Sequence, residues 1–354
     1  MMGYRKEADQ SPASLYLSIQ KKVNLVRYFL HRLGFLILSI WAALTLNFIL
    51  PRMMPGNPAE IMLGKFQGRM PPQALKAFEM QFGFSNKPMI IQYFQYLGSM
   101  LTGHWGLSYT YYPTSVQTII GNSLPWTLGL LGIVWLLSVT VGTFTGIFIA
   151  WRRGGVLDSV APIITMFFQA IPQFWLALVL LYIFGFTLNW FPMAHSYGDN
   201  VTPGWNFAFM GSVIYYAILP AVVIFLGSVS GWIIGMRNNM MMTLGEDYVV
   251  FAQAKGVSNR RLIFSYAARN ALLPQITSIA IALSTIIGGQ ILIEQVFSYQ
   301  GIGFQLTNAV SGEDYPLIQG MFLIIAVTTL LINFIVDMIY GRLDPRIRRR
   351  GATS

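Results

Sequence analysis

The sequence predicts an all-α polytopic membrane protein with six transmembrane helices and both termini in the cytoplasm. Of the 354 residues, 55% are hydrophobic and 10% are charged, whereas a soluble domain carries roughly 25% charged residues. The apolar residues form blocks of about 20, which as helices are long enough to cross a ~30 Å hydrocarbon layer. Most lysines and arginines fall on one side of these blocks, which gives the predicted orientation.

Six apolar blocks are the expected spans. The expected order is an N-terminal tail (1–28), a first span (29–50), an outer loop (51–121) and a core (122–340), followed by a basic tail (341–354). The core contains a cytoplasmic loop at 237–270 and spans at 122–151, 159–188, 213–236, 271–293 and 317–340. We expect the first block to be retained rather than cleaved as a signal peptide, because Pro51-Arg52 follows it instead of a small-x-small cleavage site.

The distribution of basic residues sets the topology. One side receives 18 of the 23 Lys and Arg residues, in both tails, the turn at 152–153 and the loop at 237–270. The others all lie in the outer loop, at Arg52, Lys65, Arg69, Lys76 and Lys87. The positive-inside rule therefore places both tails in the cytoplasm. The net charge of +10 is a topology signal, and no basic patch is left to bind nucleic acid.

The outer loop is too long to be a simple connection between spans. Its apolar spacing predicts two short amphipathic helices, at 72–82 and near 90–100. These helices have two interpretations, a cap lying on the membrane surface and a docking face for an external partner.

Prolines inside the spans predict bends. Pro172 lies in the middle of the third span and should bend it, as a hinge or packing feature. Pro125, Pro220 and Pro274 lie near the expected starts of their helices, where the missing N–H costs little.

Glycines at four-residue spacing predict close helix packing. Gly227, Gly231 and Gly235 form a ladder on one face of the fourth span, and Gly142 and Gly146 repeat the spacing in the second. Such faces let helices approach closely, so ordinary bundle packing is the favoured interpretation.

Motifs for catalysis are missing from the sequence. There is no Walker A run, no H-E-x-x-H and no G-x-S-x-G. There is no cysteine, and the three histidines lie too far apart to suggest a metal site. The sequence therefore predicts neither an enzyme nor a chain with its own metal or cofactor.

Three residues near the spans are candidates for a pathway or gate: Glu294, Phe297 and Asp337. Asp337 is either a proton relay or a paired group near the inner interface, close to Arg342, and pairing is favoured. Glu294 is either a gate-lining carboxylate or an interfacial one. An ion-coupled carrier needs midplane ionisable groups or broken helices, and this sequence supplies little for that role.

The most informative segment is the cytoplasmic loop between the fourth and fifth spans. Glu246 and Asp247 at its start and Lys255 at its end complement a helix dipole, and Gly256 is placed to end the helix in a left-handed conformation. A short helix over about 246–255 is predicted. Its apolar spacing and its small residues suit docking onto a partner surface, through Tyr248, Phe251, Ala252 and Ala254.

This loop resembles the cytoplasmic loop of ABC importer permeases, with its Ala-x-x-x-Gly signature followed by Leu-Pro. The matching residues are Ala252, Gly256, Leu273 and Pro274. The 16 residues between Gly256 and Leu273 make this loop similar to the longer form found in the oligopeptide/dipeptide branch. Further runs typical of that branch follow in order along the chain, at 27–32, 55–59, 104–108, 122–128, 171–175, 296–303, 314–320 and 344–347.

The resemblance implies a type I ABC importer permease fold in a bacterial or archaeal cytoplasmic (inner) membrane. It implies a second homologous permease, two ABC ATPases that bind ATP and Mg, and an extracytoplasmic binding protein as partners. An ATPase groove would hold the loop through Glu246, Asp247, Tyr248, Phe251, Ala252, Ala254, Lys255, Gly256 and Arg260.

The implied cargo is di- and oligopeptides. Oligosaccharides, or nickel- or glutathione-type cargo carried by the same architecture, are the alternatives. An ion-coupled secondary transporter and an intramembrane enzyme remain as interpretations from other classes.

Overall fold

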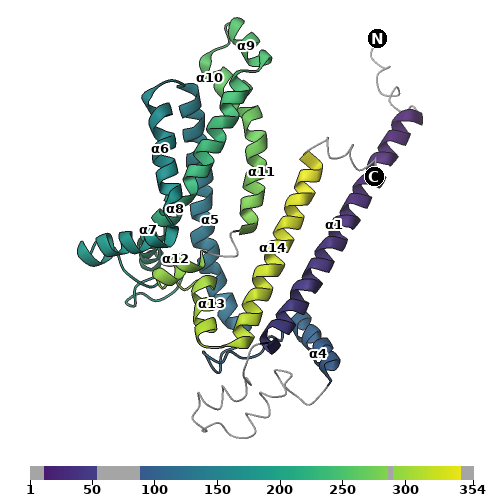
Figure 1. Cartoon of the computed structure of the whole chain (residues 1–354), viewed down its shortest axis with the longest axis vertical. Coiled ribbons are helices and arrows are strands. Elements are labelled where there is room, and N and C mark those ends of the chain that lie inside the picture. The colour runs from purple at the N-terminus through teal and green to yellow at the C-terminus, as the bar shows by residue number, and fades with distance from the viewer. Residues whose placement is uncertain (1–11, 54–87, 286–289, 344–354) are drawn as a thin grey trace.

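The computed structural model describes residues 12–53, 88–285 and 290–343, which are mainly helical. The helix expected at 72–82 lies outside these ranges. α1 (Pro12–Met53) and α14 (Tyr315–Leu343) pack against each other along one edge of the molecule (Figure 1). The other helices of the bundle are α5 (Val116–Trp151), α6 (Val156–Ala170), α8 (Phe207–Leu244) and α11 (Arg269–Thr285).

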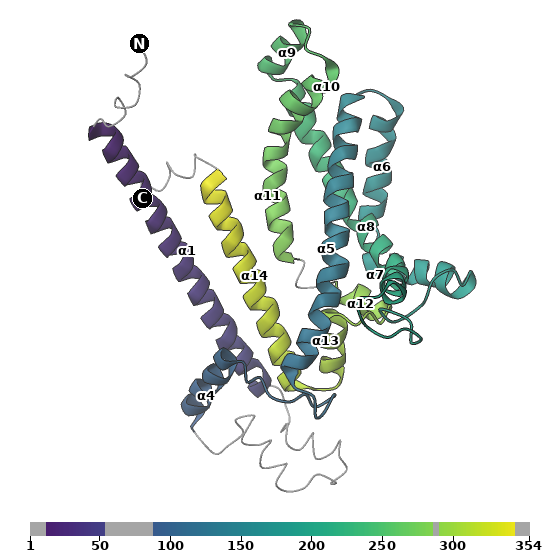
Figure 2. The ribbon, with the colours of Figure 1, turned by 180° about the vertical axis from the view of Figure 1, so that it is seen from behind.

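The two ends of the bundle carry different elements. The first residues of α1, the last residues of α14 and the short helix α9 (Asp247–Ala254) lie at one end. The opposite end carries α4 (Met89–Thr102), which corresponds to the helix expected near 90–100, and α13 (Ile302–Ser311). Figure 2 shows the same division from behind. Which of these two ends faces the cytoplasm stays a prediction from the basic residues.

Four helices are long and apolar enough to cross a membrane: Phe29–Ile49 within α1, α5, α8 and Tyr315–Met338 within α14. A fifth span results if α6 and the helix that follows it count as one bent pair. The expected span at 271–293 is described only in part, because α11 ends at Thr285 and residues 286–289 lie outside the described ranges. The described residues therefore supply four or five of the six expected spans.

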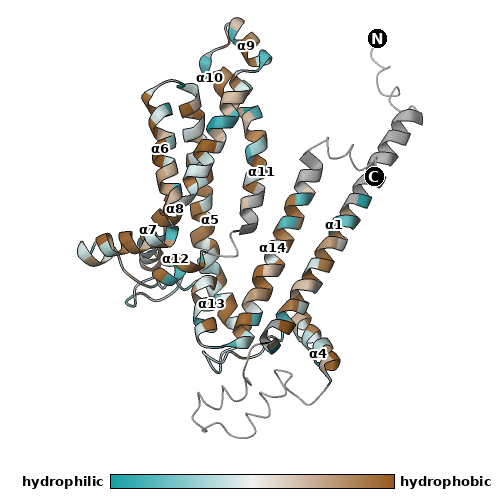
Figure 3. Ribbon diagram, viewed as in Figure 1, coloured by the Kyte–Doolittle hydropathy of each residue, from teal (hydrophilic) through white to brown (hydrophobic). Residues whose placement is uncertain are grey.

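Exposed apolar side chains cover the sides of the long helices. Ile133 of α5 and Ile163 and Phe167 of α6 are exposed. Figure 3 shows hydrophobic residues along these helices, whereas hydrophilic residues gather around α9. A surface of this kind suits contact with lipid tails rather than water.

The long helices begin before their apolar blocks. α5 begins at Val116 instead of 122, because the side chain of Ser115 caps it by accepting a hydrogen bond from the Thr118 amide at 3.3 Å. α8 runs from Phe207 to Leu244 instead of 213–236, and the Asn206 side chain accepts from the Phe209 amide at 2.8 Å. Polar side chains at the N-cap positions therefore define where α5 and α8 begin.

Pro172 has a larger effect than the predicted bend. α6 ends at Ala170, and α7 (Gln173–Leu180) starts at an angle of 91° to it and continues as the π-helical segment η1 (Leu181–Thr187). Pro172 occupies the position before α7. A proline there has a suitable φ and loses no helical hydrogen bond. The expected span at 159–188 is therefore not one helix, and α7 points away from the bundle (Figure 1).

The prediction that Pro125, Pro220 and Pro274 lie near helix starts was wrong. Pro125 and Pro220 are well inside α5 and α8. Pro274 follows a continuous helical run through α10 (Asn259–Arg261) and the π-helical segment η2 (Leu262–Ala268) into α11. The helices extend farther toward their N-termini than hydropathy indicates, which moves these prolines into the interior.

The glycines of the second and fourth spans have different surroundings. A Cβ atom on Gly146 of α5 would lie 2.6 Å from the Ile233 carbonyl oxygen of α8, so this glycine permits the α5–α8 contact. Gly227 lies against the Gln173 side chain, and Gly235 faces the Gln275 side chain. Gly231 has open space beside it. The expected ladder is therefore divided between two packed glycines and one exposed glycine.

Gly146→Ala should destabilise the protein by about 1–3 kcal/mol, because the added methyl group meets the α8 backbone. Gly132 lies on the same helix with nothing within 4 Å of a Cβ atom. Gly132→Ala is the matched control and should be neutral or stabilising by about 0.5–1 kcal/mol, because alanine favours helix. Thermal unfolding in detergent measures both. Equal shifts for the two variants would contradict this account of the α5–α8 contact.

Candidate functional site

The predicted short helix is present as α9, at one end of the bundle. Glu246 precedes it in an extended conformation, Asp247 lies in its first turn and Lys255 follows its last residue. Gly256 has a φ of +75°, the left-handed conformation that was predicted to end the helix. The acidic first turn and the left-handed glycine therefore mark the two ends of α9, although the Glu246 side chain makes no capping hydrogen bond.

One face of α9 packs on this chain. Val249 and Ala252 are buried and form a cluster with Leu262, against which Trp151 and Tyr266 pack. Ala252 was expected to face a partner together with Tyr248 and Phe251, and that prediction was wrong. The reason is that apolar residues of η2 and α5 cover this side of the short helix.

The opposite face of α9 is exposed and partly apolar. Tyr248, Val250 and Phe251 are exposed, with 61% of Phe251 accessible. The Lys255 ammonium lies 4.5 Å from the centroid of the Phe251 ring, a cation–π contact. We call Tyr248, Val250, Phe251, Ala254 and Lys255 the contact face. The docking residues expected from the sequence did not include Val250, which is exposed beside Phe251.

Tyr248 also connects α9 to the start of α11. Its hydroxyl accepts a hydrogen bond from Asn270 Nδ2 at 2.6 Å and donates one to the Tyr266 carbonyl oxygen at 3.5 Å. Sequence reasoning did not identify Asn270. A movement of α9 would reach α11 through this contact.

Arg260 is exposed on α10 and lines a cavity of about 530 Å³ with four other residues. The others are Ser258, Arg261, Phe264 and Ser265, so no acidic side chain of the described part of the chain lines this cavity. The site next to the contact face is therefore positively charged.

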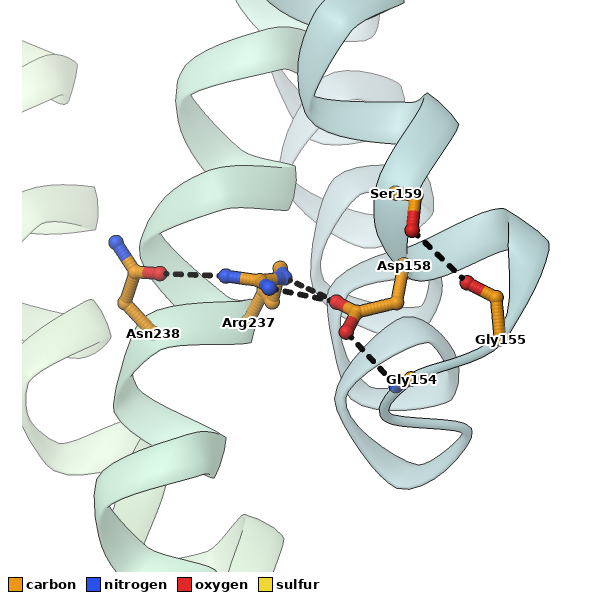
Figure 4. Close-up of polar contacts among 6 residues, drawn as sticks. All are labelled: Gly154, Gly155, Asp158, Ser159, Arg237 and Asn238. Atoms are coloured by element: carbon orange, nitrogen blue, oxygen red, sulfur yellow. Dashed lines mark hydrogen bonds and ion pairs between the residues drawn. The ribbon is translucent and has the colours of Figure 1, made fainter.

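An ion pair holds the end of α8 that leads to α9 (Figure 4). Asp158 Oδ1 accepts from Arg237 Nε at 2.7 Å and pairs with Nη2 at 2.6 Å. Asp158 Oδ2 accepts from the Gly154 amide at 3.0 Å. The pair thus joins the α5–α6 turn to α8. From the sequence, Arg237 served only as a topology signal, although both residues lie at the cytoplasmic ends of expected spans.

Within the described part of the chain, the Glu294 carboxylate does not line a gate and does not lie at an interface with solvent. It lies on α12 (Ile291–Val296) and is fully buried. Its carboxylate accepts hydrogen bonds from Thr127 Oγ1 at 2.8 Å, the Gly303 amide at 2.7 Å and the Phe304 amide at 3.3 Å. Glu294 therefore caps α13 and ties it to α5.

Phe297 is buried too, and it does not line an open path within the described part of this chain. It packs in a cluster with Leu130 of α5, Leu176 of α7 and Val223 of α8. The structure gives it a packing role in place of the expected role at a gate.

Asp314 is a second buried carboxylate, which sequence reasoning missed. It accepts hydrogen bonds from Ser108 Oγ, from the Thr110 amide at 2.8 Å and from the Leu317 amide at 3.2 Å. It caps α14 and fixes the segment before α5. Burial raises the pKa of the neighbouring Tyr109 hydroxyl, and the Asp314 charge raises it further, so Tyr109 stays protonated.

Asp337 pairs with α1. Its Oδ2 atom lies 2.8 Å from Arg32 Nη1, and 34% of the Asp337 side chain is exposed. Pairing near the helix end was the favoured interpretation, and among the described side chains Arg32 of α1 pairs with Asp337.

Among the described residues, no group of three His, Asp or Glu side chains could hold a metal ion. The candidate site has two parts. The contacts of α9 lie at one end of the bundle, and the buried carboxylates of Glu294 and Asp314 lie toward the other end. Its arrangement suits transmission of movement between helices.

Comparison with known proteins gives the family. Residues 142–349, which include α8, α9, α11 and α14, match the family described as binding-protein-dependent transport system inner membrane component. The chain is 32% identical to the di/tripeptide transport system permease protein DppB of Pseudomonas aeruginosa, over 92% of this chain and all of that protein. It is 33% identical to the oligopeptide transport system permease protein AppB of Bacillus subtilis, over 85% of this chain and 93% of that protein. The dipeptide transport system permease protein DppB of Escherichia coli is 30% identical over 92% of this chain and its own whole length. The chain belongs to the family of inner membrane components of binding-protein-dependent transport systems.

Proposed function

We propose that this chain is the permease subunit of an ATP-driven importer and forms half of a transmembrane pathway for di- and oligopeptides. The relatives from three organisms are named for di/tripeptide, dipeptide or oligopeptide transport, which supports this cargo over oligosaccharides, nickel or glutathione. The observation that carries the proposal is the exposed contact face of α9, in a chain whose sequence has no Walker A run.

Four partner subunits complete the proposed assembly: a second homologous permease, two ABC ATPases that hold ATP and Mg, and an extracytoplasmic binding protein. The family description names the dependence on a binding protein. In this assembly ATP hydrolysis takes place on the ATPases, and the present chain has no catalytic role.

The division of α9 into two faces suggests how movement is transmitted. The contact face would lie in a groove of an ATPase, with Gly256 and Arg260 beside it, while Val249 and Ala252 attach the helix to this chain. When the ATPases close, α9 would move with η2 and α11 as one body, because Tyr248 bonds to Asn270. Such rigid-body movement would convert the pathway from inward-facing to outward-facing.

Reconstitution in proteoliposomes tests the function. Uptake of a labelled peptide should require ATP, both permeases, the ATPases and the binding protein, and omission of any one should abolish it. An excess of oligosaccharide should not compete with the peptide. Uptake by this chain alone, driven by a proton or sodium gradient, would instead identify an ion-coupled carrier.

Asp337→Asn should change uptake by the complete complex less than twofold. The pair with Arg32 is partly exposed, and such pairs contribute about 0.2–1 kcal/mol to stability. The initial rate of peptide uptake measures the effect, with Asp337→Glu as the variant that keeps the charge. Loss of uptake in Asp337→Asn alone, with thermal stability unchanged, would restore the proton-relay interpretation.

A further inference from the structure

A cavity of about 640 Å³ lies near α13, toward the end of the bundle opposite α9. Its walls come from α5 and the segment before it, from the segment before α8, from Gln300 just before α13 and from Gln305 within α13. Its volume lies within the range of about 300–1,000 Å³ typical of small-molecule sites. Asn122 in the wall is exposed and Ser123 is buried, so the wall contains both surface and interior residues.

Three amide side chains in the wall have unused hydrogen-bonding groups. These are Asn122, Gln300 and Gln305. Within the described ranges, none of these side chains hydrogen-bonds to the protein, and Gln305 Oε1 is buried without a partner. Buried polar atoms normally have partners, so an unpaired amide oxygen beside a cavity points to an occupant that donates hydrogen bonds.

The remaining wall is aromatic and neutral. Trp126 and Tyr197 stack with their ring centroids 5.6 Å apart and their planes at 20°. Among the described residues, no Asp, Glu, Lys or Arg lines the cavity. It therefore suits an uncharged polar group and offers nothing to neutralise a terminal ammonium or carboxylate.

Buried polar contacts hold the walls in place. Glu294 and Thr127 cap α13, which carries Gln305, and Thr127 directly follows Trp126. The backbone N–H of Gln300 donates to Ser196 Oγ at 2.9 Å, which fixes the segment that carries Tyr197. The site is thus built before any ligand arrives, as binding sites usually are.

We propose that this cavity binds backbone amide groups of the transported peptide as it enters the pathway. The inference rests on the proposed function. Side-chain amides donate and accept hydrogen bonds as peptide groups do, so they can hold a peptide whatever its side chains are. A neutral site also avoids preference for acidic or basic peptides.

Cross-linking tests contact with the peptide. The chain has no cysteine, so Asn122→Cys places one thiol in the wall. A peptide carrying a methanethiosulfonate group should be captured by this thiol in the complete complex, in the presence of binding protein and ATP. Gly121 is exposed and does not line the cavity, so Gly121→Cys is the matched control and should not capture the peptide.

Gln305→Leu tests the unpaired amide. This variant should lower the rate of peptide import about tenfold at saturating binding protein. Its thermal stability should be equal or higher, because leucine fills the space without an unpaired polar atom. If Gln305 has only a structural role, the variant should instead lose thermal stability and peptide import together.

The two proposals fail in different ways. If the parent complex imports peptides, but Asn122→Cys captures none and Gln305→Leu imports normally, the cavity assignment is overturned and the proposed function stands. Capture of the binding protein in place of the peptide also overturns the cavity assignment. If the complete parent complex imports no peptide, both proposals fail.

Discussion

Phe251→Glu is expected to lower peptide uptake by the complete complex about tenfold or more, without loss of folding or membrane insertion. The Phe251 side chain is 61% exposed, so this chain's own packing does not depend on it. Burying such a side chain in an ATPase groove contributes about 1.5–3 kcal/mol, and 1.4 kcal/mol corresponds to a factor of ten in affinity. Peptide uptake and peptide-stimulated ATP hydrolysis by the purified complex measure the effect.

A matched control comes from the end of α8. Met242 is 76% exposed and lies outside the contact face, so Met242→Glu adds the same charge nearby and should leave uptake within about twofold of the parent. Ala252→Glu should differ from both, because Ala252 is buried and a charge there also lowers thermal stability. If Phe251→Glu and Met242→Glu behave alike, the contact face has been assigned wrongly.

The same coupling defect is expected from a charge at Gly256. Asparagine and aspartate both tolerate a left-handed conformation better than most residues, and there is open space beside Gly256. Gly256→Asn and Gly256→Asp therefore differ mainly in charge. Only the aspartate variant should lose uptake, and unchanged uptake in Gly256→Asp would remove Gly256 from the contact with the ATPase.

Glu294→Leu is expected to lower the free energy of unfolding by about 3 kcal/mol or more. The change leaves the Gly303 and Phe304 amides and the Thr127 hydroxyl without their acceptor, and each unpaired buried group costs about 1–3 kcal/mol. Glu294→Gln keeps one acceptor oxygen and should lose less. Thermal unfolding of the purified chain in detergent measures the difference.

The control for this prediction is Glu313→Leu. Glu313 lies in the turn between α13 and α14, it is exposed, and its carboxylate accepts no hydrogen bond from the described residues. Its removal should have little effect on unfolding. Parent-like stability in Glu294→Leu, combined with loss of uptake, would contradict the capping role and favour a carboxylate that acts in the pathway.

The ends of α9 could be predicted from the sequence because they depend on local rules. Acidic residues at the start, Lys255 at the end and a left-handed Gly256 act within a few residues of one another. Which face of α9 is exposed was not predictable in the same way. Ala252 is buried by Leu262 and Tyr266, and their positions depend on the path of η2.

The buried carboxylates depend on contacts that are distant in sequence. Glu294 bonds to Thr127 across 167 residues, and Asp314 bonds to Ser108 across 206 residues. No hydropathy or spacing pattern gives such partners, so Glu294 looked interfacial and Asp314 was missed. The break at Pro172 was predictable only in part. A proline in mid-span predicts a bend, but the angle of 91° depends on packing against other helices.

The central claim is that α9 transmits movement from an ATPase, and a single cysteine tests it most directly. Phe251→Cys gives the only thiol in this chain, to which benzophenone maleimide can be attached in the complete complex. Irradiation should cross-link this chain to an ATPase subunit, with a yield that changes between the ATP-bound and nucleotide-free states. Cross-linking to lipid alone in every nucleotide state, in a complex that still imports peptide, would contradict the account.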